Sequence, residues 1–116
     1  MNKLLIAIAI IILPAYSFAD NGSECQIEAQ GYEKTYEYLQ NHVFSFQQYF
    51  ETLSVRGVQK AEFFSCNGEE GYLLIQTHER SYIYKNVPRD VWEEFKFTNS
   101  IESYYVQHIR FSYIMV

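Results

Sequence analysis

The sequence lacks the common signatures of catalysis and of a membrane span. It contains no Gly-x-Ser-x-Gly, no His-Glu-x-x-His and no glycine-rich phosphate loop. Its three histidines, His42, His78 and His108, do not have metal-ligand spacing, and none neighbours a nucleophile in a recognisable motif. No apolar run reaches the roughly twenty residues that a spanning helix needs. We therefore expect no catalytic, cofactor or metal site and no stable membrane insertion of the mature chain.

Cysteine is also scarce, because only Cys25 and Cys66 are present. Two cysteines without a nearby cysteine or histidine ligand do not favour a metal site. In an oxidising compartment an even number suggests a bridge, although two buried free thiols are the alternative. A Cys25–Cys66 disulfide would close a loop of about forty residues and stabilise the domain by roughly 4 kcal/mol in the chain-entropy model.

The one long apolar run is at the N-terminus and predicts a secretory signal peptide. Lys3 is followed by uninterrupted apolar residues from Leu4 to Leu13, and Ser17-Phe18-Ala19 precedes Asp20. A basic start, a short apolar core and small residues before a cut are typical of such signals. We expect residues 1–19 to be removed, leaving one mature domain, 20–116, that is periplasmic or secreted. A retained membrane anchor is the alternative.

Positive charge is also in short supply in the mature chain. All fourteen acidic residues lie from Asp20 onward and Lys3 would be lost with the signal, so the mature net charge is 8 − 14 = −6. Nucleic-acid binding depends on neutralising phosphates, which this balance opposes. The charge suits a basic protein partner or simply favours solubility.

Aromatic residues are abundant instead. The mature chain holds nineteen, of which ten are tyrosines. Core filling is one interpretation. The other is an exposed aromatic face, because tyrosine is enriched in interfaces and a buried hydroxyl needs a hydrogen-bond partner.

The apolar pattern changes its period along the chain. Spacing of three and four predicts a helical region followed by a stop near Gly57, with a possible break at Asn41-His42; its members are Tyr32, Tyr36, Leu39, Val43, Phe46, Phe50 and Leu53. After Gly57, segments 58–65, 72–77 and 82–85 indicate an antiparallel meander of three strands.

The last part of the chain predicts two helices. Pro88 ends the third strand and suits a helix start, with Val91, Trp92 and Phe95 forming the apolar face of the first helix. Asn99 and Glu102 resemble a helix cap and its reciprocal acid before the second helix. The apolar tail 111–116 is expected to pack back onto the domain, with an edge strand as one possibility. The predicted fold class is α+β: an N-terminal helical region, a three-stranded antiparallel sheet and two C-terminal helices.

Residues 82–113 carry a spacing that resembles the KTSC domain, a small bacterial module found alone and at the C-terminus of some lysyl-tRNA synthetases. The matching positions are Tyr82, Tyr84, Val87, Pro88, Val91, Trp92, Phe95, Ser100, Tyr104, Tyr105, Ile109, Arg110 and Tyr113. A looser likeness extends over 54–113. Thr98, Glu102 and Val106 stand where the family usually has Ala, Gly and Asn. The resemblance implies a fold, and a nucleic-acid role has been suggested for the family, which the charge opposes here.

These observations favour a small secreted protein-binding module without enzymatic activity. One concrete form is an immunity-type protein that neutralises a toxin or effector in the bacterial periplasm. Three alternatives remain. One is a small secreted enzyme or toxin, in which His78 or His108 would pair with a Ser or Glu, and another is nucleic-acid binding by analogy with the family. The third is a structural or phage-related accessory role, which the sequence does not separate from the binding module.

Overall fold

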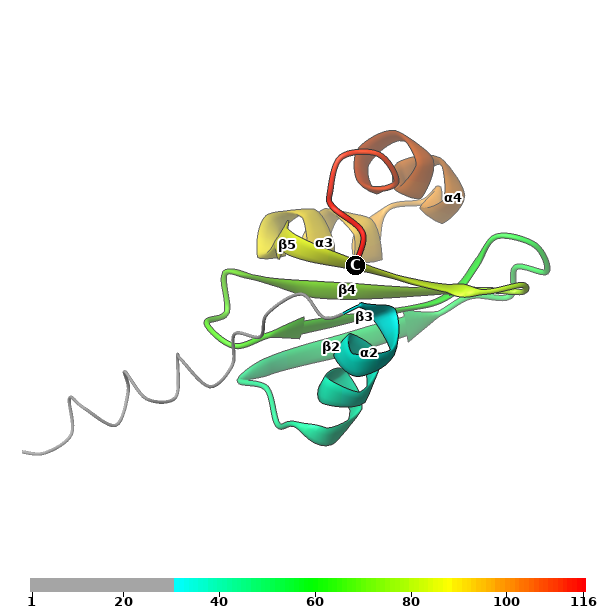
Figure 1. The fold of residues 1–116 in the computed structure, drawn as a ribbon. Coiled ribbons are helices and arrows are strands. Elements are labelled where there is room, and N and C mark those ends of the chain that lie inside the picture. The colour runs from blue at the N-terminus through cyan, green and yellow to red at the C-terminus, as the bar shows by residue number, and fades with distance from the viewer. Residues whose placement is uncertain (1–30) are drawn as a thin grey trace, which may run out of the picture.

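The fold is built on a four-stranded antiparallel sheet. The computed structural model describes residues 31–116, so the predicted signal peptide 1–19 and Cys25 lie outside the described residues. The strands are β2 (Phe46–Glu51), β3 (Val58–Ser65), β4 (Glu70–Thr77) and β5 (Ser81–Pro88), and each pairs with the next along the chain in the order β2-β3-β4-β5 (Figure 1). The predicted α+β class and antiparallel meander are confirmed, but the strand count of three is wrong.

The additional strand, β2, lies where the sequence pattern predicted helix. The helical region ends at Asn41, because α2 covers only Tyr32–Asn41. Phe46 and Phe50 are four residues apart, a spacing that places side chains on one face of a helix and equally on one face of a strand. In β2 their side chains and that of Gln48 face the core while the residues between them face solvent. Val43 and Leu53, assigned to the helical stripe, are almost fully exposed, and Gly57 lies in the β2–β3 loop.

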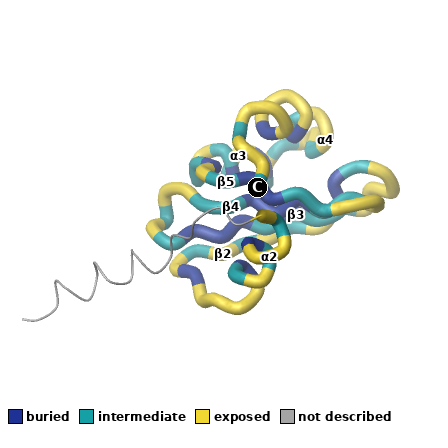
Figure 2. The backbone as a smooth tube through the Cα atoms, in the orientation of Figure 1, coloured by how far each residue is buried: buried dark blue, intermediate teal, exposed yellow. Residues whose placement is uncertain are grey.

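One face of the sheet is covered by the C-terminal helices. Helix α3 (Arg89–Phe97) begins directly after Pro88, which caps its N-terminus, as the sequence indicated. Trp92 is fully buried and stacks between Phe50 and Phe63, with ring centroids 5.5 Å away from each. The buried members of this cluster are Val58, Ala61, Phe63, Leu73, Ile75, Tyr84, Val87, Trp92, Phe95, Tyr105 and Ile109. Most of the domain's apolar burial therefore lies between the sheet and these helices (Figure 2).

The opposite face of the sheet carries a smaller core under α2. Leu39 of α2 packs with Phe44, Phe64, Leu74 and Ile83, all buried. Strand residues alternate between the two cores, because successive side chains of a strand point to opposite faces. The sheet is thus the middle layer, with α2 on one face and the C-terminal helices on the other (Figure 1).

A bulge in β5 keeps Val87 on the same face as Tyr82 and Tyr84. The register with β4 shifts between Gly71 and Leu73, so that β5 has one extra residue there. Asn86 has a φ of 59°, the left-handed conformation that asparagine tolerates better than most residues. The extra residue changes the alternation and directs Val87 into the core.

The chain ends with a short helix, a π-helical turn and a returning tail. Helix α4 (Ile101–Tyr104) continues into η2 (Tyr105–Ile109). The predicted Asn99 cap is wrong: Ser100 occupies the N-cap without a side-chain bond, and Glu102 accepts a hydrogen bond from the Val58 N–H at 2.9 Å instead. The predicted return of the tail is confirmed, because Met115 pairs with Tyr84 of β5.

Candidate functional site

Four of the five motif tyrosines meet in a cleft between β5, the β2–β3 loop, the β4–β5 turn and the C-terminal segment. The cleft has a volume of about 660 Å³ and is lined by four tyrosines, two arginines, two glutamates and four other residues. They are Tyr82, Tyr84, Tyr105, Tyr113, Arg56, Arg110, Glu79, Glu102, Gly57, Thr77, Phe111 and Met115. We call this the tyrosine cleft.

The inner wall of the tyrosine cleft is a pair of hydrogen-bonded phenols. The hydroxyl oxygens of Tyr84 and Tyr105 are 2.7 Å apart, and the two residues are only 2% and 6% exposed. Burial raises the pKa of both, so both are neutral at physiological pH. Two phenols carry two O–H protons, and one hydrogen bond uses one of them. Among the described residues no other hydroxyl contact accounts for the second proton.

The π-helical turn brings Tyr105 and Arg110 to the same site. The Arg110 N–H donates to the Tyr105 carbonyl oxygen at 2.9 Å, a bond that spans five residues rather than four. The wider turn brings residues five apart closer to one face than an α-helix does, and single π-turns occur frequently at functional sites. The Arg110 charge acts on both phenols, since it opposes the rise in the pKa of each.

Glu102 and Gly57 meet at another part of the cleft lining. A Cβ atom on Gly57 would lie 2.0 Å from Glu102 Oε1, so this carboxylate occupies the space that a side chain at position 57 would need. Glu102 stands where the family usually has glycine. In this chain the Glu102 carboxylate accepts a hydrogen bond from the backbone N–H of Val58 at the start of β3.

The cleft contains both signs of charge. Arg56 and Arg110 face it together with Glu79 and Glu102. Within residues 31–116 the ion pairs are Arg89–Glu93 and Lys96–Glu93, so neither cleft arginine is neutralised by a salt bridge there. The guanidinium of Arg110 lies 5.1 Å from the centre of the Phe111 ring.

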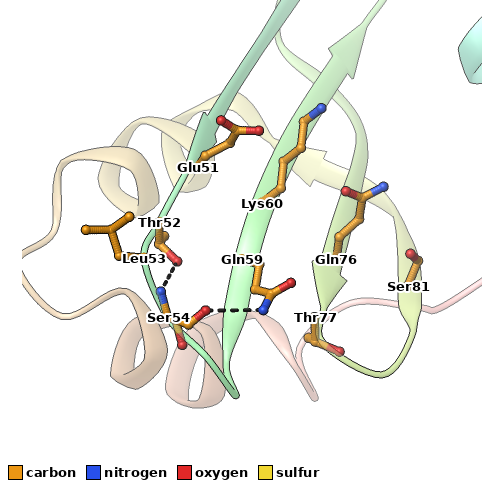
Figure 3. A pocket seen from close by; sticks show the side chains of 9 residues that line it. All are labelled: Glu51, Thr52, Leu53, Ser54, Gln59, Lys60, Gln76, Thr77 and Ser81. Carbon is orange, nitrogen blue, oxygen red and sulfur yellow. Dashed lines mark hydrogen bonds between the residues drawn. The ribbon is translucent and has the colours of Figure 1, made fainter.

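A second, shallower hollow lies at the end of the sheet beside the β2–β3 loop (Figure 3). Glu51, Lys60, Gln76 and Ser81 form a row across the four strands, in register with one another. The polar groups of the adjoining turns bond to one another: Thr52 Oγ1 donates to the Val58 carbonyl, and other bonds join the loop to itself. These hydrogen bonds hold the ends of the two hairpins together, and the hollow follows from that arrangement.

The remaining residues of the KTSC-like motif mostly have structural positions. Val87, Trp92, Phe95 and Ile109 are buried in the larger core. The Tyr104 hydroxyl donates to Glu94 at 2.7 Å, and its ring stacks on Phe95. The KTSC-like motif therefore contains two groups of residues: those that fill the core and the tyrosines that line the cleft.

Sequence reasoning missed Arg56, Gly57 and Glu102 as neighbours of the motif tyrosines. The β2–β3 loop reaches the cleft only because β2 exists, and β2 was not predicted. Arg110 carried a usable signal, since it belongs to the matched spacing. Cys66 lies beside the smaller core, whereas its predicted partner Cys25 is outside the described residues, so the disulfide stays a prediction.

The comparison with known families concerns the segment that builds most of this cleft. Residues 69–113 match the KTSC domain. The resemblance found in the sequence is thus confirmed over β4, β5 and the C-terminal helices, which we call the KTSC segment. No curated protein and no solved structure gave a significant match to the chain.

Among residues 31–116 no helix has the length and apolar character that crossing a membrane requires. The same residues hold no group of three or more histidine, cysteine or acidic side chains arranged to bind a metal ion.

Proposed function

We propose that this protein is a non-enzymatic protein-binding module that acts in the periplasm or after secretion, with the tyrosine cleft and its rim as the binding face. The signal-like sequence 1–19 and the mature charge of −6 support the compartment and a basic partner. The observation that carries the proposal is the apolar rim of the cleft.

The rim consists of apolar side chains that the domain does not bury. Phe111 is 83% exposed although it lines the cleft, and Met115 beside it is about half exposed. Val55, also largely exposed, directly precedes the cleft residue Arg56. Exposed apolar side chains around a hollow with polar groups are typical of interaction sites. The exposed ring of Phe111 lacks the stabilisation of burial within the domain, and a partner that covers it would supply that burial.

The test uses a pair of phenylalanines with similar exposure. Phe97 is 76% exposed but lies at the end of α3 and does not line the cleft. The mature protein, tagged at its N-terminus, is immobilised and exposed to an envelope extract of the native cell in three forms: wild type, F111S and F97S. We expect one stoichiometric protein partner to bind wild type and F97S and to be lost from F111S.

The affinity of the partner gives a second test of the binding face. A specific partner should bind with a Kd of about 1 μM or tighter, which corresponds to roughly −8 kcal/mol. Retention that is equal for all three forms, or a weaker Kd, would contradict the proposed binding face.

An immunity-type role makes a further demand on the partner. Directed to the periplasm alone, the partner should inhibit growth, and co-expression of the wild-type protein should restore it, whereas F111S should not. A partner that is harmless in the periplasm would exclude this form while leaving a binding module.

A further inference from the structure

The tyrosine cleft presents hydrogen-bond donors that have no acceptor among residues 31–116. The buried Tyr84–Tyr105 pair retains one O–H proton that their mutual bond does not use, as described above. The Arg110 guanidinium faces the same cleft and has no salt bridge within the described part of the chain. A buried donor without an acceptor costs about 1–3 kcal/mol, so a ligand that accepts from it recovers this energy.

We propose that the Tyr84–Tyr105–Arg110 end of the cleft is a binding site for a carboxylate on a ligand with an apolar body. A carboxylate only accepts hydrogen bonds, and its two oxygens can take one bond from a phenol and another from a guanidinium. The site goes beyond the proposed protein-binding role, since a small acid could occupy it with or without a protein on the rim.

The charges of the cleft favour a monoanion over a phosphate dianion. The two arginines are balanced by Glu79 and Glu102, so the lining has no net charge. A single negative charge placed beside Arg110 is attracted by the guanidinium. The second charge of a dianion would be repelled by the carboxylates of Glu79 and Glu102, and the lining has no net positive charge to offset this repulsion. The carboxylate of Glu102 also accepts a hydrogen bond from the Val58 N–H, which holds it at the start of β3.

The apolar body of the ligand is indicated by the outer wall. Phe111 and Met115 line the cleft and are exposed, and the Tyr82 and Tyr113 rings lie on the same lining. An aromatic or aliphatic group in this position removes apolar surface from water, at roughly 25 cal/mol per Å². A hydrophilic acid such as acetate would lack this contribution.

The test is a titration of the mature wild-type protein followed by amide chemical shifts. The probes are phenylacetate and its neutral amide, phenylacetamide. We expect phenylacetate to shift the resonances of Tyr84, Tyr105 and Arg110 with a Kd in the millimolar range, and phenylacetamide to bind at least about tenfold more weakly, or about 1.4 kcal/mol. Equal binding of acid and amide, or no shift at about 10 mM probe, overturns the proposal.

Variants locate the carboxylate. R110Q should weaken phenylacetate binding at least about tenfold, whereas K34Q, on α2 at the other face of the sheet, should leave it within about twofold. The Y84F/Y105F variant removes both phenol donors and should also weaken it. If these variants fold poorly, the comparison of acid and amide on wild type still decides. An R110Q protein that folds and binds as tightly as wild type refutes the site.

Two further probes distinguish the source of the carboxylate. Acetyl-Ala-Phe with a free C-terminus represents a peptide end, and its C-terminally amidated form is the matched control. If the free peptide binds more tightly than phenylacetate and the amidated peptide does not bind, the site takes peptide C-termini. If phenylacetate is the tighter ligand, it takes free small acids. A peptide that binds equally well in both forms argues against carboxylate recognition.

Discussion

Removing the amide of Gln48 should destabilise the domain more when Trp92 is present than when it is absent. The Gln48 Oε1 accepts a hydrogen bond from the Trp92 indole N–H at 2.9 Å and another from Lys96 Nζ. Because Trp92 is fully buried, Q48L leaves the indole N–H without an acceptor, which costs about 1–3 kcal/mol. Against a total stability of roughly 5–15 kcal/mol, this change is easily measured.

The double-mutant cycle isolates this hydrogen bond. In a W92F background there is no indole donor, so Q48L removes only the bond to Lys96, which keeps a partly exposed salt bridge to Glu93 at 3.2 Å. That loss should cost no more than about 1 kcal/mol. We therefore expect a coupling energy of about 1–2 kcal/mol between the two substitutions.

The assay is urea unfolding of the four proteins followed by far-ultraviolet circular dichroism. Fluorescence is unsuitable because Trp92 is the only tryptophan. A coupling energy below about 0.3 kcal/mol, with unchanged m-values, would refute the reasoning, since independent sites add within that margin. It would also count against the placement of β2 beside α3.

Three further predictions concern alkaline stability, close backbone contacts and covalent processing. Burial holds the pKa of Tyr84 and Tyr105 above the ordinary value of 10.0, so their contribution to stability should be complete below pH 10 and should fall as the pH rises further. Phenolate absorbance of wild type that exceeds that of the Y84F/Y105F variant while the circular dichroism stays native would contradict this. G71A should lower the free energy of unfolding in urea by more than about 2 kcal/mol, because the new Cβ would lie 2.0 Å from the Phe64 carbonyl oxygen. In G57A the new Cβ meets the carboxylate of Glu102, which can move, so most of the destabilisation should disappear in the G57A/E102A variant. Intact mass of the exported protein should correspond to residues 20–116 with no thiol available for alkylation before reduction; a mass that includes residues 1–19, or alkylation without reductant, would contradict the predicted processing.

Where the sequence pattern had one structural interpretation, it predicted the fold correctly. Tyr82 and Tyr84 alternate with Ile83 and Lys85, and the two tyrosines face the larger core as the alternation implied. Pro88 marks the end of β5 and the start of α3, because a residue without an N–H and with a fixed φ suits both positions.

Where two interpretations fit, the sequence could not decide. The Phe46–Phe50 interval satisfies the period of a helix and of a strand, and only the pairing of β2 with β3 selects the strand. Glu102 was read as part of a local cap, but its partner is Val58, forty-four positions away. The cleft depends on such distant contacts, so its tyrosines could be found in the sequence while their neighbours Arg56, Gly57 and Glu102 could not.

The position of Trp92 has a consequence for how fragments of this protein should be made. Its two stacking neighbours, Phe50 on β2 and Phe63 on β3, both precede the KTSC segment 69–113, which is the part recognisable by sequence. A peptide cut to the matched boundaries would hold two strands and expose the largest side chain of the core to water. The unit of recognition is therefore shorter than the unit of folding, and an expression boundary placed at residue 69 would divide one hydrophobic core.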